Sequence, residues 1–110
     1  MLKTVSIKEN RTFSYLYRRG QFISSDCLIL YFRNNRFENN RLGITVTKKV
    51  GKAVIRNRVR RRIKEAYREL EGKIPSSLDI VIVARSMAAQ VDYNKLLSAL
   101  KYMFKKAGLI

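Results

Sequence analysis

The sequence predicts an α+β domain in which helices pack against a small mixed sheet, in the order helix, strand, strand, helix, strand, helix. Three observations lead to this prediction. Two short stretches are rich in strand-forming residues, one stretch is apolar almost without interruption, and three stretches repeat apolar residues at helical spacing. At 110 residues the chain has the size of a single domain, 1–110, able to bury about 65% of its unfolded surface.

The first helix is expected from Ile7 to Arg19. The residues SIKE from Ser6 to Glu9 have the form of a capping box, in which the first and fourth side chains satisfy backbone N–H groups. A glycine follows the stretch, where helices commonly end. Phe13 and Tyr17 lie four residues apart and therefore share one helical face.

Two strands are expected next, from Cys27 to Phe32 and from Arg41 to Thr47. In the first, alternation separates Ile29 and Tyr31 from Leu28, and both faces carry apolar residues. The asparagine-rich connection between the two stretches is typical of a turn. Because the strands are neighbours in the sequence, we expect them to form an antiparallel hairpin.

The second half of the chain predicts helix, strand and helix. One helix is expected to start at Ala53 or Arg56 and to end at Glu71, before a glycine and a proline. The residues from Leu78 to Ala84 are almost all apolar, as in a central strand that is covered on both faces. The last helix is expected from Asp92, a suitable N-cap, to Lys106.

The composition is strongly basic and still apolar enough to fold. Lysine and arginine total 24 against 8 acidic residues, for a net charge of +16, while 46% of the residues are hydrophobic. That apolar content excludes a disordered basic tail. Such a charge excess suits a polyanionic partner, and nucleic acid fits better than an anionic membrane surface.

Cysteine usage and hydropathy bear on the compartment. Cys27 is the only cysteine, and the chain has no histidine, so neither an internal disulfide nor a cysteine- or histidine-rich zinc site can form. The first residues lack the apolar stretch of a secretory signal, and no run approaches the ~20 apolar residues of a membrane span. We therefore expect a cytoplasmic protein.

The helix expected after Ala53 has an apolar stripe and two different flanks. At 100° per residue, the stripe consists of Val59, Ile63, Ala66, Tyr67 and Leu70. We call one side of this stripe the acid-free flank; it consists of Arg56, Asn57, Arg60, Arg61, Lys64 and Arg68. On the other side Arg58 and Arg62 share the surface with Glu65 and Glu69, where pairs three or four residues apart can neutralise each other.

The positive charge continues into the loop before this helix. From Lys48 to Lys64, nine of seventeen residues are basic and none is acidic. The planar guanidinium of arginine matches phosphate with two hydrogen bonds and can stack on bases, so the surface suits RNA. A merely solvated helix would interleave both signs of charge.

The stretch KKVGKAVIRNRVRRRIKE, from Lys48 to Glu65, resembles the signature of the bacterial ribonuclease P protein component, centred on its Arg-Asn-Arg motif. The similarity extends over nearly the whole chain. It includes Phe13 with Tyr17 before Arg19-Gly20, the strand ending at Tyr31, Arg41-Leu42-Gly43, and Ile80 to Arg85. One departure is Tyr17, which stands where the family more usually has phenylalanine and adds a hydroxyl group to the stacking face.

The resemblance implies a function and a fold. Family members are the small basic subunit of a ribonucleoprotein that removes the 5′ leader from precursor tRNA; the RNA subunit is the catalyst and uses Mg²⁺, while the protein binds the leader. The expected partners are thus ribonuclease P RNA and precursor tRNA, with no cofactor held by the protein. The implied fold has helices on one side of the sheet and a left-handed crossover, against the general right-handed rule.

Two sets of site residues follow. The resemblance places Phe13, Tyr17, Ile29 and Tyr31 in a cleft for the single-stranded leader, and alternation adds Thr45 and Thr47 from the polar side of the next strand. Stacking on aromatic rings tolerates any base, which suits leaders of variable sequence. The alternative is that Phe13 and Tyr17 are ordinary core residues. The second set is assigned to RNA: Lys48, Lys49, Lys52, Arg56, Asn57, Arg58, Arg60, Arg61, Lys64 and Arg68.

The residue inventory argues against a protein-borne active site. Without histidine the chain lacks the imidazole acid and base of many metal-free ribonucleases, and its eight acidic residues form no close motif for two-metal chemistry. A stand-alone nuclease is therefore disfavoured. The second hypothesis is a structural RNA-binding protein of ribosomal type, which would use the same basic helix without a leader cleft.

Overall fold

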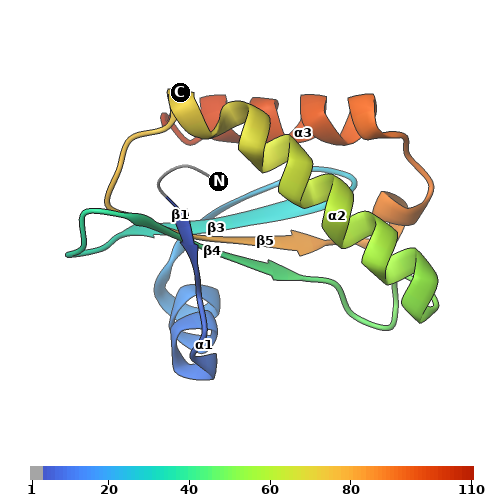
Figure 1. Cartoon of the computed structure of the whole chain (residues 1–110), viewed down its shortest axis with the longest axis horizontal. Coiled ribbons are helices and arrows are strands. Elements are labelled where there is room, and N and C mark those ends of the chain that lie inside the picture. Colours follow the sequence, from blue (N-terminus) through green and yellow to red (C-terminus); the bar gives the residue numbers. More distant parts are fainter. Residues whose placement is uncertain (1–3) are drawn as a thin grey trace.

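A computed structural model describes residues 4–110, which form one five-stranded mixed sheet, three α-helices and two short 3₁₀ helices. Figure 1 shows their arrangement. In chain order the elements are β1 (Thr4–Ser6), α1 (Asn10–Arg19), β2 (Gln21–Ser24), β3 (Leu28–Asn34), β4 (Asn40–Thr45), α2 (Ala53–Leu70), η1 (Glu71–Lys73), β5 (Leu78–Ala84), η2 (Ser86–Ala89) and α3 (Tyr93–Lys106).

The sheet has the strand order β1-β4-β5-β3-β2, so β5 separates the two strands that were expected to pair. Gly43 of β4 pairs with Val81 in a parallel ladder, and Tyr31 of β3 pairs with Val81 in an antiparallel one. The prediction of a hairpin between β3 and β4 is therefore wrong. The most apolar strand takes the central position, where both of its faces are covered, although it comes last in the sequence.

Helices cover both faces of the sheet. Helices α2 and α3 lie on one face, and α1 lies on the opposite face (Figure 1). This corrects the expectation of helices on one side only. The physical reason is that β5 is apolar on both faces: Ile80 and Ile82 pack under α2 and α3, whereas Val81 packs with Leu16 of α1.

The connection from β4 through α2 to β5 is a crossover between neighbouring parallel strands. In Figure 1 the chain runs along β4 in front, returns over the sheet as α2, and enters β5 behind, which is the left-handed sense. The unusual hand implied by the family resemblance is confirmed. Its consequence is that α2 covers the same face of the sheet as α3 and leaves the opposite face to α1.

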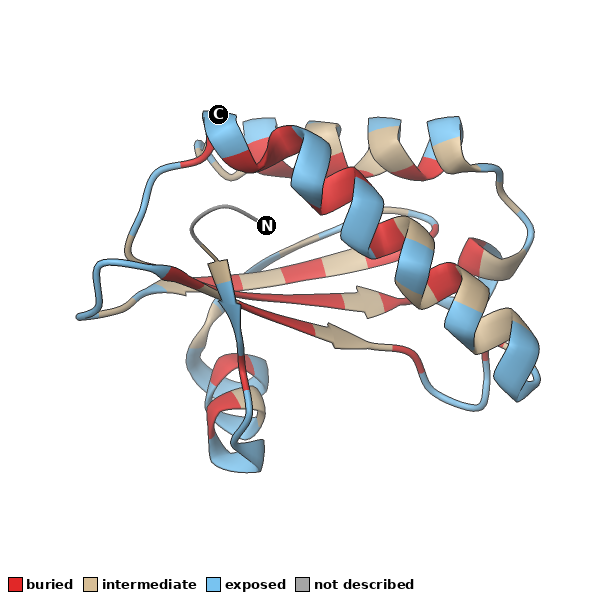
Figure 2. Cartoon of the chain, viewed as in Figure 1, coloured by how far each residue is buried: buried red, intermediate tan, exposed pale blue. Residues whose placement is uncertain are grey.

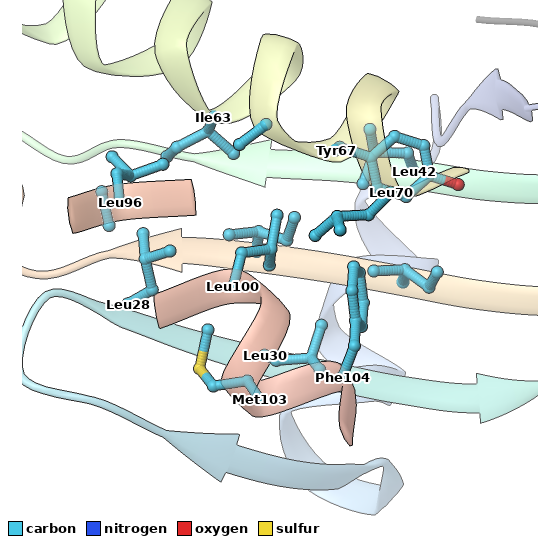
Figure 3. Close-up of a cluster of buried hydrophobic side chains, with 14 of the residues drawn as sticks. Leu28, Leu30, Leu42, Ile63, Tyr67, Leu70, Leu96, Leu100, Met103 and Phe104 are labelled. Carbon is cyan, nitrogen blue, oxygen red and sulfur yellow. The ribbon is translucent and has the colours of Figure 1, made fainter. Parts of the chain in front are cut away.

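The main core lies between the sheet and the two long helices. Figure 3 shows buried side chains of both helices in this core, among them Ile63 and Tyr67 of α2 and Phe104 of α3. The ring centroids of Tyr67 and Phe104 are 6.4 Å apart. The predicted apolar stripe of α2 is confirmed, because its five residues are the buried residues of that helix (Figure 2). The predicted cap of α3 is also confirmed, since the Lys95 backbone N–H donates to the Asp92 carboxylate at 2.8 Å.

The start of the chain differs from the predicted capping box. Thr4–Ser6 form an edge strand, and α1 begins only at Asn10, with Glu9 in the N-cap position and no side-chain cap. The Ile7 N–H donates to the Leu42 carbonyl at 2.9 Å and so extends the pairing with β4. The open edge of β4 thus binds backbone that would otherwise begin the helix. No helix within residues 4–110 has both the length and the apolarity needed to cross a membrane.

Candidate nucleic-acid interface

Helix α1 packs closely against the sheet because Gly43 of β4 has no side chain at the point of contact. A Cβ atom added at Gly43 would lie 2.5 Å from two ring carbons of Phe13, so the ring rests directly on the glycine. Leu16 is fully buried beside Val81 and anchors the helix. This packing leaves Tyr17, one helical turn after Phe13, at the rim with 41% of its surface exposed.

Four aromatic side chains form a continuous line across this face, which we call the aromatic row: Phe13, Tyr17, Tyr31 and Phe22. Their successive ring centroids are 6.4, 5.1 and 5.8 Å apart. The Tyr17 hydroxyl forms a hydrogen bond of 2.8 Å with the Thr45 hydroxyl, which fixes the orientation of its ring. The row therefore offers tilted, partly exposed rings on whose open surfaces bases can stack.

Most of the residues predicted for the leader cleft lie along this row. Phe13, Tyr17, Tyr31 and Thr45 are joined by the ring contacts and the hydrogen bond already described. Ile29 is half-buried on β3, two residues from Tyr31 and so on the same face of the strand. Thr47 lies beyond the end of β4, where its carbonyl accepts from the Val50 N–H at 3.1 Å, so it belongs to the loop rather than to the strand.

Sequence reasoning missed Phe22. It lies on the edge strand β2 opposite Tyr31 and is 63% exposed, which is unusual for a phenylalanine. The available signal was an apolar pair, Phe22 and Ile23, directly after the glycine that ends α1. Four residues are too few for a confident strand assignment, so the edge strand was not predicted.

A hollow of about 220 Å³ connects the aromatic row with the basic helix. It lies between the β1/β4 edge of the sheet and α2. Its lining residues are Ser6, Ile7, Phe13, Leu42, Gly43, Ile44, Arg60 and Lys64. Two members of the acid-free flank thus face the same space as the first ring of the row.

Most of the acid-free flank and the loop before it are open to solvent. Lys48, Lys49 and Lys52 are exposed, and Arg60 is half-exposed and donates to the Asn57 side-chain oxygen at 3.2 Å. Arg68 departs from the expectation, because it shares a shallow hollow with Glu65, Glu69 and Tyr93. The positive surface is therefore strongest over the first turns of α2 and weakens toward its end.

Arg58 and Arg62 are turned toward the body of the protein. Arg58 donates to the Ala89 carbonyl at 3.4 Å and Arg62 donates to the Val91 carbonyl at 3.3 Å. Within residues 4–110 neither forms an ion pair with the glutamates of α2, so the expected neutralisation by Glu65 and Glu69 is wrong. Backbone carbonyls of η2 and of the connection between η2 and α3 take that place, and the assignment of Arg58 to RNA stays a prediction.

Glu69 has a different partner. It accepts a hydrogen bond from the Tyr93 hydroxyl at 2.9 Å. Partial burial, together with this carboxylate and that of Glu65, raises the pKa of Tyr93 to about 12. The phenol therefore stays protonated and links α2 to α3 throughout the physiological range.

The comparisons with known proteins agree with this geometry. The family model described as Ribonuclease P matches residues 1–108. The ribonuclease P protein component of Clostridium botulinum (strain Langeland) is 46% identical over 109 residues, covering 98% of each chain.

Two solved structures are similar over most of the chain. The ribonuclease P protein of Staphylococcus aureus superposes with a TM-score of 0.86 at 31% identity, covering 94% of this chain and 95% of that one. The protein from Thermotoga maritima superposes with a TM-score of 0.82 at 30% identity, covering 92% and 96%. The likeness therefore covers nearly the whole chain.

Proposed function

The chain belongs to the ribonuclease P protein family, and on that basis we propose that its aromatic row binds the single-stranded 5′ leader of precursor tRNA, while the acid-free flank binds the RNA subunit and the backbone of the leader. RNA binding and tRNA 5′ processing follow from the family itself. The proposal concerns which surface binds which RNA.

One observation carries the proposal: the first ring of the aromatic row and two basic side chains of α2 line one hollow. Phe13 faces the same space as Arg60 and Lys64. A strand whose bases stack along the row can therefore place its backbone beside these two positive charges. This combination of aromatic platforms and a basic track is how proteins bind single strands without strong sequence preference.

We place the catalytic groups, and the Mg²⁺ they require, on the RNA subunit. The chain has no histidine, which removes the usual side chain for proton transfer near neutral pH. Its fully buried carboxylate, Asp79, accepts from the guanidinium groups of Arg33 and Arg41, so its oxygens are already engaged. The role left to the protein is to position the substrate and to offset phosphate repulsion.

The test is reconstitution with the cognate ribonuclease P RNA, measuring the binding of precursor and mature tRNA by Tyr17→Ala protein. Loss of one stacking ring should weaken precursor binding by about 1–3 kcal/mol and leave mature tRNA, which lacks a leader, almost unchanged. Tyr102→Ala is the matched control, because that tyrosine is also exposed but lies on α3, across the sheet. Equal losses of affinity for both tRNAs would contradict the assignment of the aromatic row to the leader, without affecting family membership.

The basic surface has its own test in the same system. Arg60→Ala should weaken RNA binding and make its salt dependence shallower, by about 0.7–0.9 in log–log slope for each phosphate that the arginine neutralises. An unchanged slope would remove Arg60 from the interface. If the protein neither binds the cognate RNA nor stimulates the cleavage of precursor tRNA by that RNA at low Mg²⁺, a structural role of ribosomal type becomes the better hypothesis.

A further inference from the structure

A second, larger hollow lies on the other side of α1, beside the loop that joins β3 to β4. Figure 1 shows this loop at one end of the sheet. Its volume is about 590 Å³, within the range of pockets that hold small ligands. It shares no residue with the aromatic row or with the acid-free flank. The lining residues are Glu9, Arg11, Thr12, Tyr15, Arg19, Arg33, Asn34, Asn35, Arg36, Phe37 and Arg41.

A buried carboxylate fixes the back wall of this hollow. The side chain of Asp79 is fully buried and accepts from Arg33 Nε at 2.9 Å and from Arg41 Nε and Nη2 at 2.7 Å each. Asn35 Nδ2 donates to Asp79 Oδ1, which also accepts from Arg41 Nε, at 2.9 Å. Both guanidinium groups are therefore held in place before any ligand arrives.

The loop above the hollow is also fixed by hydrogen bonds. The Phe37 N–H donates to the Asn35 side-chain oxygen at 2.8 Å, and the Ser77 hydroxyl donates to the Phe37 carbonyl at 2.6 Å. Phe37 is nevertheless 54% exposed. The loop thus presents an apolar ring to solvent from a rigid backbone.

Cations and rings alternate around the opening. The Arg33 guanidinium carbon lies 4.1 Å from the centroid of the Tyr15 ring, and that of Arg41 lies 4.8 Å from the centroid of Phe37. Each arginine is therefore oriented by a ring as well as by a carboxylate. The exposed ring faces remain available for a base.

The charge of the hollow is only partly neutralised. Its five arginines exceed the carboxylates of Glu9 and Asp79 by three. Glu9 pairs with Arg11 at 2.7 Å. Among residues 4–110, Arg19 and Arg36 have no side-chain hydrogen bond or ion pair, so two guanidinium groups remain free to bind an anion.

We infer that this hollow is a second RNA site, which binds one nucleotide of a single-stranded segment, with its phosphate between Arg19 and Arg36 and its base on Tyr15 or Phe37. An acidic peptide would use the arginines but not two exposed rings beside them. Arginine with aromatic platforms is the combination that recognises unpaired RNA. The segment can come from the distal part of a leader or from an unpaired region of the RNA subunit.

The absence of tryptophan from the chain gives a clean reporter. Phe37→Trp keeps an aromatic ring beside Arg41 and introduces a single tryptophan at the hollow. Tyr102→Trp is the matched control, because Tyr102 is also 54% exposed and has Lys106 Nζ at 5.7 Å from its ring centroid, but lies on α3. The probe is an octameric oligouridylate titrated into the full-length protein.

We expect the oligonucleotide to quench Trp fluorescence at position 37 and not at position 102. Adding Arg36→Ala to the Phe37→Trp protein should weaken the apparent affinity several-fold and lower its log–log salt slope by about 0.7, the value for one phosphate of a single strand. Lys105→Ala, which removes an exposed charge on α3, should change neither. Equal quenching at both positions, or no effect of Arg36→Ala, overturns the inference.

Two further arms separate this site from the leader cleft and identify its source of RNA. Tyr17→Ala should leave quenching at position 37 intact; its complete loss would mean that the oligonucleotide binds only along the aromatic row, and overturns the inference. Quenching on addition of ribonuclease P RNA alone would identify the RNA subunit as the source. Quenching only by precursor tRNA with a long leader would identify the leader, and quenching by neither overturns the inference.

Discussion

The two faces of the sheet are built from the same strands but are covered very differently. Above β3, β4 and β5, the long helices α2 and α3 close a core in which Leu30, Ile80 and Ile82 are fully buried. Below, the ten residues of α1 cover Val81 completely but leave Tyr31 and Val83 half-buried. Strands that are apolar on both faces therefore give a sealed core on one side and an open, ring-lined rim on the other.

This difference separates stability from recognition. Both proposed RNA sites outside α2 adjoin α1, with the aromatic row on one side of it and the arginine-lined hollow on the other. A short helix on a two-sided apolar sheet leaves space at both of its flanks. Substitutions on the sealed face should act mainly on folding, and those on the open face mainly on binding.

The largest effect is expected in the sealed core. Leu100→Ala removes a fully buried side chain of α3 (Figure 3) and should lower the free energy of unfolding by about 3–5 kcal/mol, because the cavity adds to the lost transfer energy. Urea unfolding followed by circular dichroism measures this. Tyr17→Ala on the open face is the comparison, and a destabilisation as large as that of Leu100→Ala would contradict the division between the faces.

The buried carboxylate of Asp79 makes the free energy of unfolding depend on pH in the acid range. Burial alone would raise the pKa of this carboxyl, but hydrogen bonds from Arg41, Asn35 and Arg33 outweigh burial and lower it. A lowered folded pKa stabilises the protein above the unfolded value of about 3.9, and this stabilisation disappears as pH falls through the folded value. Stability should therefore decline below about pH 4 because of this group.

Asp79→Asn tests that dependence. It should cost about 1–3 kcal/mol near neutral pH, since the two arginines lose a charged acceptor but are partly exposed and can be solvated again. The acid part of its stability profile should be flatter than that of the unchanged protein. A profile that falls as steeply below pH 4 would show that other carboxyl groups govern acid unfolding.

A methyl group at Gly43 should disturb the open face from beneath. Gly43→Ala places a Cβ atom where the Phe13 ring now lies, so the ring must move, at a cost of about 1–3 kcal/mol. Precursor tRNA binding should weaken together with stability, because the displaced ring is the first of the aromatic row. Gly72→Ala is the control, since a Cβ atom there would meet nothing within 4 Å.

The smallest effect is expected for the tyrosine hydroxyl at the rim. Tyr17→Phe removes only the hydrogen bond to Thr45 and should change stability by about 1 kcal/mol or less. The stacking face is retained, so leader affinity should stay within a few-fold of its original value. A decrease as large as that of Tyr17→Ala would instead assign the hydroxyl a direct interaction with RNA.

The sequence correctly predicted features that depend on residues close together along the chain. The central strand from Leu78 to Ala84 has the bounds observed, and the buried stripe of α2 contains the residues that helical spacing indicates. The N-cap at Asp92 is also as expected. Each of these features depends on residues within a few positions of one another along one element.

Predictions that depended on neighbours in space were less successful. The hairpin of β3 with β4 was wrong because β5 inserts between them, and β1 and β2 were missed because three and four residues give almost no periodic signal. Phe22 could not join the aromatic row without its edge strand. The arginine-lined hollow was also not predicted, since its residues come from α1, β3, β4 and the connections beside them.

By itself, the sequence determined the family, the basic charge, the apolar helix stripes and the central strand, because these are properties of order and composition. Only the tertiary structure decided that α1 lies alone on its face, that its rings continue to Phe22, and that Asp79 gathers Arg33 and Arg41 from separate strands. The physical reason is that strand order follows burial: the most apolar strand takes the middle of the sheet, and this brings together residues that no local pattern connects.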